Sequence, residues 1–314
     1  MNNYLNQWIS IIEGMVNSNT YKIMWGKAII DILEDKERPN ITFEQIAHKM
    51  IGYYWDLEFF FGLKQAPQKE KSPVIVQVVQ EIIESYKLNA SPIPDWYIKV
   101  ERDLQKNPQF NRWVRKIISI MKLDVSHRFL IVGETSLPIY VLDKKAETIT
   151  FYQSQIEVIK KNGFVLKQLL NYKLAQLLEQ YNDSPRITQK VRGLSDQQLR
   201  RSSLKKFKGI LLSITPDQPI LDFYTGEILE RNDISLDHVI PWSFIYSDDI
   251  WNLVITSKSN NSKKSNLTPS KEIIEKLQQR NHKLLNSNIP SKQKEAIRIS
   301  IEQNYPLKFL NRMQ

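Results

Sequence analysis

The first third of the chain repeats apolar and polar positions with the spacing of amphipathic helices. Runs of this kind cover residues 4–16, 20–33, 43–61, 74–86, 95–104 and 110–121. Several of the breaks between them carry proline, which cannot continue the hydrogen bonding of a helix. At the start of the third run, Thr42 and Gln45 have the spacing of a capping box. The pattern therefore predicts an all-helical region over residues 1–123.

The pattern changes near residue 126. Three short runs rich in β-branched and aromatic residues follow, at residues 128–132, 139–142 and 148–152, with turn-like stretches between them. Such runs are typical of a small antiparallel sheet. Helical spacing returns at residue 154 and stops near residue 183. We expect residues 124–210 to hold a small sheet, a helix and a basic connector.

The last third combines short strands with helices. Residues 220–229 have the pattern of a strand, a turn and a returning strand, and residues 236–240 form a further short strand that Pro241 ends. A helix is expected in the polar run after Thr256, and two more over residues 270–285 and 291–304. We therefore predict a mainly helical α+β protein with a third domain over residues 211–314.

The composition is that of an ordinary folded protein, with 41% hydrophobic and 25% charged residues among 314. There are no cysteines, which excludes disulfides, cysteine-bound zinc and thiol catalysis. No apolar run approaches the roughly 18–20 residues of a membrane span, and the first residues lack the basic and apolar segments of a signal peptide. We expect a cytoplasmic protein that does not contact a membrane.

A net charge of +10 favours a polyanionic partner, of which nucleic acid is the commonest. Residues 186–208 are especially basic, with eight lysines and arginines against the single acid Asp196. Two interpretations stay open for this segment, a solvated helix face or a strip that contacts phosphates. The candidate phosphate contacts within it are Arg200, Arg201, Lys205 and Lys206.

Candidate catalytic residues lie side by side at Asp237-His238, just before Pro241. Adjacent residues on a flat strand point to opposite faces, so this pair can serve one site only where the strand twists or ends. Phosphodiester hydrolysis needs a base for the attacking water and positive charge for the phosphate. An imidazole titrates near neutral pH and suits the role of base.

Two asparagines and a lysine follow at informative spacings. The carboxylate of Asp237 and the side-chain carbonyl of Asn261 are hard oxygen ligands that suit Mg²⁺ or Mn²⁺. Asn261 and Lys264 are three residues apart on a predicted helix and therefore share a face. Lys264 and its neighbour Lys263 are candidates for pairing with phosphate. Asn252 is better placed to hold the loop between strand and helix by hydrogen bonds.

This stretch resembles the HNH, or ββα-metal, nucleases, and most closely the HNH domain of CRISPR RNA-guided DNA nucleases. The shared features are Asp-His-Val-Ile-Pro-x-Ser-Phe from Asp237, a central Asn252, Asn-x-x-Lys-Ser from Asn261 and a Tyr-x-Gly turn from Tyr224. The resemblance covers residues 218–270. It implies a catalytic set of Asp237, His238, Asn252 and Asn261. In that set His238 is the general base, Asp237 and Asn261 hold one metal ion, and Asn252 is structural.

One departure from many members of that family concerns zinc. Those enzymes carry two Cys-x-x-Cys knuckles around a structural zinc ion. The corresponding positions here are Asp222, Thr225, Ser257 and Asn260. We therefore expect no structural zinc, and a small domain that is held together by packing through Trp242, Phe244 and Trp251.

The leading hypothesis is a metal-dependent HNH endonuclease that cuts DNA, most simply double-stranded DNA. The order of a helical N-terminal region and a C-terminal HNH module is similar to stand-alone bacterial endonucleases of restriction and phage defence. Two alternatives stay open: an RNA-cleaving or toxin-type nuclease, and a DNA-binding component with a silent HNH module that acts with a partner. Cutting both strands with one site per chain needs two copies or two events, which leaves a homodimer or a defence-system partner open.

Overall fold

The computed structural model describes residues 3–35, 39–66, 72–194, 203–214 and 218–313. The chain divides into two compact units, which are described separately below. The first contains residues 1–183 and 187–198, and the second contains residues 184–186 and 199–314. Among the described residues, no helix has both the length and the apolar character that crossing a membrane requires.

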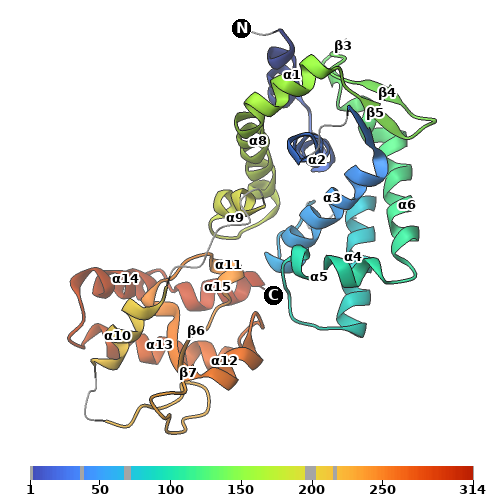
Figure 1. Ribbon diagram of the computed structural model, residues 1–314. Helices are drawn as coiled ribbons and strands as arrows, with labels where there is room; N and C mark the ends of the chain where they lie inside the picture. The colour runs from blue at the N-terminus through green and yellow to red at the C-terminus, as the bar shows by residue number, and fades with distance from the viewer. Residues whose placement is uncertain (1–2, 36–38, 67–71, 195–202, 215–217, 314) are drawn as a thin grey trace. The chain divides into compact units, whose positions relative to one another are not determined.

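Helices make up most of the N-terminal unit (Figure 1). They are α1 Asn3–Gly14, α2 Tyr21–Asp35, α3 Phe43–Trp55, α4 Val74–Asn89, α5 Tyr97–Gln105, α6 Phe110–Ile120, α7 Ser126–Arg128, α8 Gln153–Tyr181 and α9 Ile187–Gly193, with π-helical turns η1 Asp56–Phe60 after α3 and η2 Met121–Val125 after α6. The predicted helices are present, with ends shifted by a few residues. The capping box at the start of α3 is confirmed, because Thr42 accepts from the Gln45 backbone and Gln45 from that of Thr42.

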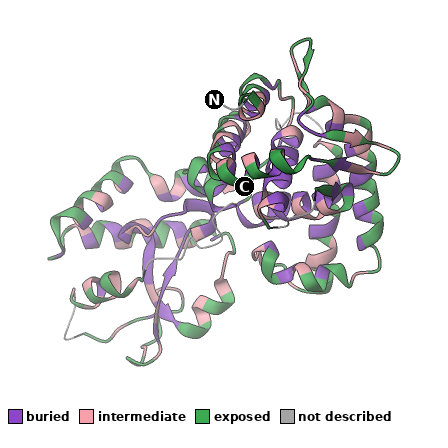
Figure 2. Cartoon of the chain, turned by 45° about the horizontal axis from the view of Figure 1, so that its top comes forward, coloured by how far each residue is buried: buried purple, intermediate pink, exposed green. Residues whose placement is uncertain are grey.

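The core of this unit forms around α2, most of which is buried (Figure 2). The long helix α8 packs against both α1 and α2. At one crossing of α2 and α8, a side chain at Gly163 would meet the carboxylate of Glu34 at 2.2 Å. Glycine leaves room there for the Glu34 side chain and for Ile30 of α2, whose Cγ2 would lie 3.3 Å from an added Cβ.

The strands of the N-terminal unit form two small antiparallel sheets. They are β1 Asn40–Thr42, β2 Ile131–Val132, β3 Thr135–Ser136, β4 Val141–Asp143 and β5 Thr148–Thr150. A hairpin joins β2 to β3, and a three-stranded sheet has the order β1-β5-β4, in which the buried Ile41 and Ile149 face each other in register.

The pairing of β1 with β5 changes the predicted domain division. Residues 1–123 and most of residues 124–210 belong to one compact unit, where the sequence pattern predicted a boundary at residue 123. The outer strand of the sheet comes from residues 40–42, a three-residue run too short for any periodic signal. The expected strand over residues 128–132 is also shorter, since α7 occupies its first residue.

The C-terminal unit contains two paired strands and a set of helices. Its elements are α10 Lys205–Leu212, β6 Ile234–His238, α11 Trp242–Ile245, the 3₁₀ turn η3 Ile250–Asn252, β7 Leu253–Ser257, α12 Lys258–Lys264, α13 Lys271–Leu285, α14 Ser291–Glu302 and α15 Tyr305–Met313. Strands β6 and β7 are antiparallel, with Leu236 opposite Ile255, and α12 packs against both. The strand and return expected over residues 220–229 reduce to a single bridge between Leu221 and Ile228.

The core of this unit lies on the helical side of β6 and β7. Phe244 and Trp251 are buried there against Phe309 of α15, with ring centroids 6.0 and 6.1 Å apart. These two aromatic residues hold the unit together, as the sequence suggested. Trp242 is different, because its side chain is only half-buried and lines a cavity instead.

Candidate functional site

The C-terminal end of β6 places Asp237 and His238 at one cavity of about 310 Å³. Both residues are 6% exposed, although they are adjacent on a strand. They reach the same cavity because the strand ends at His238, so the strict alternation of faces ends there too. The lining residues are Ser235, Asp237, His238, Trp242, Lys258, Asn261, Ser262, Ser265 and Asn266.

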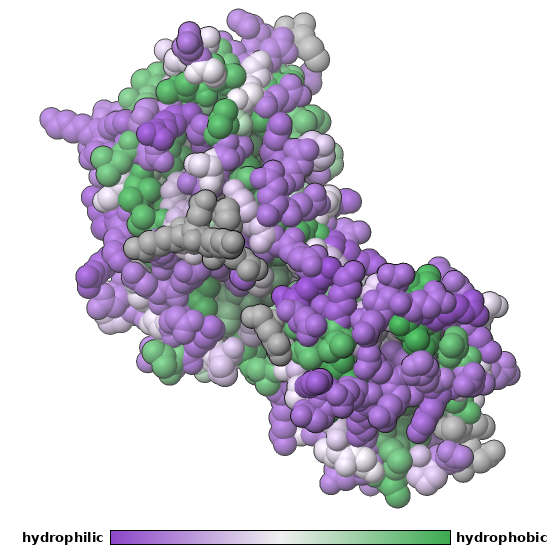
Figure 3. Space-filling view, turned by 180° about the vertical axis from the view of Figure 1, so that it is seen from behind, coloured by the Kyte–Doolittle hydropathy of each residue, from purple (hydrophilic) through white to green (hydrophobic). Residues whose placement is uncertain are grey.

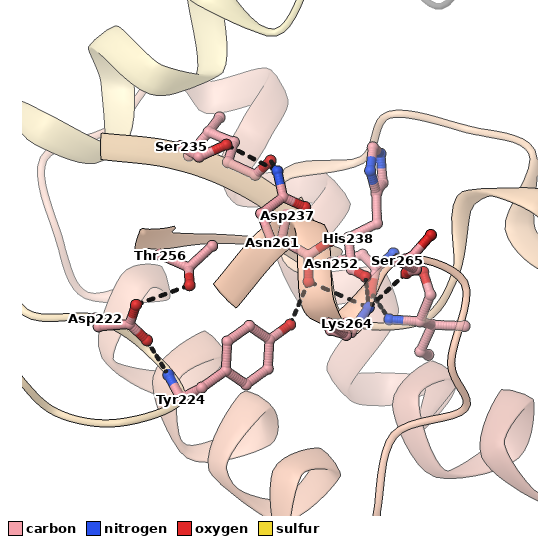
Figure 4. Close-up of polar contacts among 12 residues, drawn as sticks. Asp222, Tyr224, Ser235, Asp237, His238, Asn252, Thr256, Asn261, Lys264 and Ser265 are labelled. Atoms are coloured by element: carbon pink, nitrogen blue, oxygen red, sulfur yellow. Dashed lines mark hydrogen bonds and ion pairs between the residues drawn. The ribbon is translucent and has the colours of Figure 1, made fainter. Parts of the chain in front are cut away.

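The carboxylate of Asp237 is held from two directions. Its Oδ2 accepts a hydrogen bond from the Tyr224 hydroxyl, and the Lys264 ammonium lies 3.1 Å from the same oxygen (Figure 4). Burial and the negative charge of Asp237 both raise the pKa of Tyr224, so its hydroxyl keeps its proton and remains a donor. These two contacts fix the orientation of the carboxylate.

Lys264 points into the domain. Its Nζ also donates to the backbone carbonyl of His238 at 2.6 Å. Burial lowers the pKa of Lys264 below its ordinary value, while Asp237 partly offsets this effect. The sequence predicted that this ammonium group pairs with a phosphate. In the structure it forms an ion pair with Asp237 and a hydrogen bond with the neighbouring backbone carbonyl.

The imidazole of His238 contacts a carboxylate that the sequence reasoning missed. Its Nε2 lies 2.9 Å from Oδ1 of Asp248, in the loop between α11 and η3. The side chains are 7% and 17% exposed, respectively. The pair is thus sheltered from water while the histidine still lines the cavity.

Asn252 joins the turn η3 to the segment that follows β6. Its Oδ1 accepts from the Ile240 N–H and its Nδ2 donates to the Ile240 carbonyl, both at 2.8 Å. Its backbone carbonyl accepts from Val239 at 3.0 Å. Asn252 is fully buried, so these three bonds replace the strand pairing that Pro241 interrupts.

Asn261, on α12, faces β6. Its Nδ2 donates to Ser235 Oγ at 2.8 Å and to the Leu236 carbonyl at 3.1 Å, as Figure 4 shows for Ser235. The amide nitrogen of Asn261 is thus used in contacts with β6, and the amide oxygen makes neither of these two bonds. Lys264 also donates to β6, at the His238 carbonyl. Asn261 and Lys264 therefore share the face of α12 that meets β6, the arrangement expected from their spacing.

A second carboxylate, Asp222, contacts the other positions that the sequence analysis compared with the cysteines of zinc knuckles, namely Thr225, Ser257 and Asn260. Its oxygens accept from the backbone N–H groups of Thr225 and Ser257 at 3.2 and 2.8 Å and from Asn260 Nδ2 at 3.0 Å. Thr256 Oγ1 and the Tyr224 N–H donate as well, each at 2.8 Å. We call these residues the Asp222 cluster.

The hydrogen bonds of the Asp222 cluster stabilise the charged form of the Asp222 carboxylate. Burial raises the pKa of Asp222, but the donors from Ser257, Asn260, Thr256 and Thr225 outweigh this effect and lower it to about 2. The carboxylate therefore stays charged over the whole ordinary pH range. It fastens the turn that carries Tyr224 to the junction of β7 and α12.

Helix α13 holds the turn η3 through side-chain hydrogen bonds to its backbone. The Arg280 guanidinium donates to the backbone carbonyls of Ile250 and Trp251 at 3.3 and 3.0 Å, and Asn281 donates to Trp251 at 3.0 Å. Burial lowers the pKa of Arg280 to about 9, with Tyr224 acting in the opposite direction. The turn that carries Asn252 is thus anchored on a helix.

The other residues expected to contact nucleic acid are dispersed. Lys263 is exposed on α12, and Lys205 and Lys206 are exposed on α10. Arg200 and Arg201 lie outside the described residues. The face of the C-terminal unit seen in Figure 3 is largely hydrophilic.

The residues at the cavity suit a divalent cation that keeps most of its water. Among the described residues, no three His, Asp or Glu side chains form a ligand cluster. Mg²⁺ does not need one, because it is commonly held by one or two protein oxygens together with water and substrate phosphate. Asp237 and Asn261 both line the cavity and offer such oxygens. The donor set therefore fits Mg²⁺ or Mn²⁺.

Comparison with known proteins identifies this segment. Residues 222–270 match the model of the HNH endonuclease family. This segment is an HNH endonuclease domain. Over 76 residues the chain is 40% identical to the CRISPR-associated endonuclease Cas9 of Listeria innocua serovar 6a, and 38% identical to that of Streptococcus mutans serotype c. Each match covers 23% of this chain and only 6% of the relative. No solved structure matches the chain.

The sequence motif located the HNH domain but missed part of its support. Tyr224 was recognised as part of a turn and not as a donor to Asp237. Asp222 was recognised only as a position without cysteine, where zinc-binding HNH enzymes have one. Its hydrogen bonds to the start of α12 were not predicted. Asp248 carried no signal, because it lies in an irregular loop ten residues after its partner.

Proposed function

We propose that the protein is a metal-dependent endonuclease whose HNH domain hydrolyses phosphodiester bonds of DNA. The observation that carries this proposal is the convergence of Asp237, His238 and Asn261 on one cavity within a segment that matches the HNH family. In this proposal His238 is the general base, Asp237 and Asn261 hold one Mg²⁺ or Mn²⁺ ion, and the strands and helix around them form the ββα-metal arrangement.

The chain's own groups account for the handling of water and substrate. His238 takes the proton of the attacking water, a step within the reach of a sheltered imidazole. Tyr224 and Lys264 keep the Asp237 carboxylate in one orientation, and Asn252 keeps the backbone after His238 in place. A bound divalent ion supplies positive charge for the phosphate and for the leaving oxygen.

Charge favours nucleic acid as the substrate. The N-terminal unit, residues 1–183 and 187–198, carries 25 Lys and Arg against 22 Asp and Glu, and the C-terminal unit, residues 184–186 and 199–314, carries 19 against 12. The unit with the HNH domain therefore holds most of the surplus of +10. Lys258 lines the cavity and Lys263 is exposed near it, so both are placed to meet a phosphate backbone.

The test is cleavage of supercoiled plasmid with Mg²⁺ or Mn²⁺, with wild type compared with His238→Ala. Wild type should give nicked or linear product, and the variant should lose about 100-fold or more of the rate while it still binds DNA. EDTA should abolish cleavage by wild type. Equal cleavage by the two proteins in Mg²⁺ would sink the role of His238.

Single-stranded DNA and RNA presented in parallel separate DNA cleavage from an RNA-cleaving or toxin-type nuclease. Binding without cleavage of any substrate, with every divalent metal and with added cell lysate, would indicate a silent HNH domain. The proposal assigns target selection, dimerisation or contact with a partner protein to the N-terminal unit, in a restriction or phage-defence role. A homodimer or two successive events would be needed for a double-strand break.

A further inference from the structure

The environment of His238 contains a partner that the HNH signature does not include. Asp248 Oδ1 lies 2.9 Å from His238 Nε2, the distance of a strong hydrogen bond. A carboxylate can only accept, so the ring must carry its proton on Nε2 for this bond to form. In the neutral imidazole, Nδ1 then has the free electron pair.

We propose that Asp248 is a positioning residue that holds His238 in the Nε2–H tautomer, so that Nδ1 is the basic atom of the site. This inference rests on the proposed function of His238 as the general base. An imidazole has two nitrogens, and only one can accept the proton of the attacking water. Asp248 makes that choice by occupying the other.

The loop that carries Asp248 is fixed at both ends. On one side, Tyr246 ends α11 in a left-handed conformation with φ of 57° and donates its N–H to the Trp242 carbonyl. On the other side, the Asn252 N–H donates to the Asp249 carbonyl at 2.9 Å. The aspartate therefore reaches the ring from a short braced loop, which limits how far the ring can rotate.

The contact between Asp248 and His238 also suits the positive charge that the imidazole gains when it accepts a proton. When the ring takes a proton on Nδ1 it becomes positive, and a carboxylate already lies on its opposite edge. Asp248 is 17% exposed, so it retains some contact with solvent.

The first measurement is the tautomer of His238 in the full chain. The chain has four histidines, so the signals of His238 in ¹⁵N-labelled protein can be assigned by difference from His238→Gln. Spectra recorded at alkaline pH, where imidazoles are neutral, should show the proton on Nε2 in wild type. A wild-type ring with its proton on Nδ1 would overturn the inference without any variant of Asp248.

The second measurement is single-turnover cleavage of plasmid at saturating DNA and metal. Asp248→Asn can donate to the ring as well as accept from it, so it should shift the ring toward the Nδ1–H tautomer. It should slow the chemical step about 10- to 1,000-fold, with the Kd for DNA unchanged within about twofold. Asp248→Glu should recover much of the rate, because it restores a carboxylate acceptor.

Asp249→Asn is the matched control. It removes the same charge one residue away and keeps an oxygen that can accept from Ser247, whose hydroxyl lies 2.7 Å from the Asp249 carboxylate. It should cleave like wild type. A wild-type rate and an unchanged tautomer in Asp248→Asn would overturn the role of Asp248 while leaving the nuclease itself intact. Failure of wild type to cleave any substrate would instead refute the proposed function.

Discussion

At the scale of single residues, contacts within the chain hold the side chains of the site in place. The carboxylate of Asp237 has two partners, Tyr224 and Lys264, and the loop after β6 has a dedicated asparagine. Each of these side chains is mostly buried, so each contact is formed away from competing water. Preorganisation of this kind lowers the cost of arranging ligands when the substrate arrives.

Lys264 competes with a cation for the carboxylate of Asp237. Its ammonium group lies 3.1 Å from Oδ2, so Lys264→Met removes a positive charge next to a proposed ligand. We expect the Mg²⁺ concentration for half-maximal cleavage to fall about 5- to 30-fold, which corresponds to about 1–2 kcal/mol of removed repulsion. A Mg²⁺ titration of plasmid nicking measures this, with Lys263→Met as the exposed neighbouring control. A higher Mg²⁺ requirement in Lys264→Met would show that the lysine supports metal binding.

Asn252 acts through both atoms of its amide. In Asn252→Asp the oxygen that replaces Nδ2 would face the Ile240 carbonyl, so one hydrogen bond becomes a repulsion in a buried place. We expect unfolding of the C-terminal unit to become easier by about 2–4 kcal/mol at neutral pH. The loss should shrink in mildly acidic solution, because a protonated Asp can donate as the amide does. Urea titrations at two pH values test this, and equal losses at both would contradict it.

At the scale of elements, the Asp222 cluster joins the positions that the sequence comparison with zinc-binding HNH enzymes singled out for their lack of cysteine. One carboxylate gathers donors from the turn at residues 222–225 and from the start of α12. Packing alone, through the aromatic side chains, was the expectation from the sequence. The structure adds a polar fastening to the aromatic core, next to Phe223 and Tyr224, which pack against that core.

Asp222→Ala should loosen this fastening. The buried N–H of Ser257 and the hydroxyl of Thr256 would lose their acceptor, at a cost of about 2–4 kcal/mol. Hydrogen–deuterium exchange should accelerate in peptides over residues 222–226 and 254–260. Glu227→Ala is the control, since the Glu227 carboxylate is exposed and its one described contact is with the Thr225 hydroxyl, whereas its backbone carbonyl, which accepts from the Asp222 N–H, is kept in the variant. Equal exchange in the two variants would argue against the cluster.

The same cluster sets a pH dependence. The pKa of Asp222 is about 2 in the folded chain and near 3.8 without these contacts, so the folded state favours the charged form. The stabilisation, on the order of 2 kcal/mol, is therefore fully present above about pH 4 and is lost as the pH falls through about 2. The stability gap between wild type and Asp222→Ala should narrow over that interval in urea titrations. A constant gap would contradict this origin of the effect.

The sequence predicted elements better than contacts between them, for a physical reason. Amphipathic spacing is local, so α4 or α13 can be recognised from a few turns of helix without knowledge of the rest. The strand β1 has three residues and becomes a strand only by pairing with residues 148–150. In the same way Asp237, His238 and Asn261 were found as a spaced motif, whereas Tyr224 and Asp248 act through contacts that no period encodes.

At the scale of the whole molecule, charge and chemistry lie in the same unit. The C-terminal unit has its own hydrophobic core and carries +7 of the net charge of +10, while the larger N-terminal unit carries +3. Recognition of a polyanion by this unit would release counterions, which makes binding dependent on salt.

Salt titrations therefore test the exposed lysines of α10. With the His238→Ala variant and a short duplex, the plot of log Kd against log salt concentration should show a steep dependence. Replacing both Lys205 and Lys206 with Gln should reduce the slope by about 1–2. The control is Lys106→Gln, because Lys106 is already paired with Asp103 at 2.7 Å. An unchanged slope in the double variant would remove α10 from the DNA interface.

The position of α15 has a consequence for protein synthesis. Phe309 of α15 packs on Trp251, the residue before Asn252, so α15 supports the turn that holds the backbone after His238. While a ribosome is still making the chain, the motif residues emerge well before residues 305–313 do. We expect a stalled nascent chain that ends before α15 to be inactive on DNA, and cleavage to begin once α15 has emerged. Such a delay would keep an incomplete nuclease harmless to its own cell.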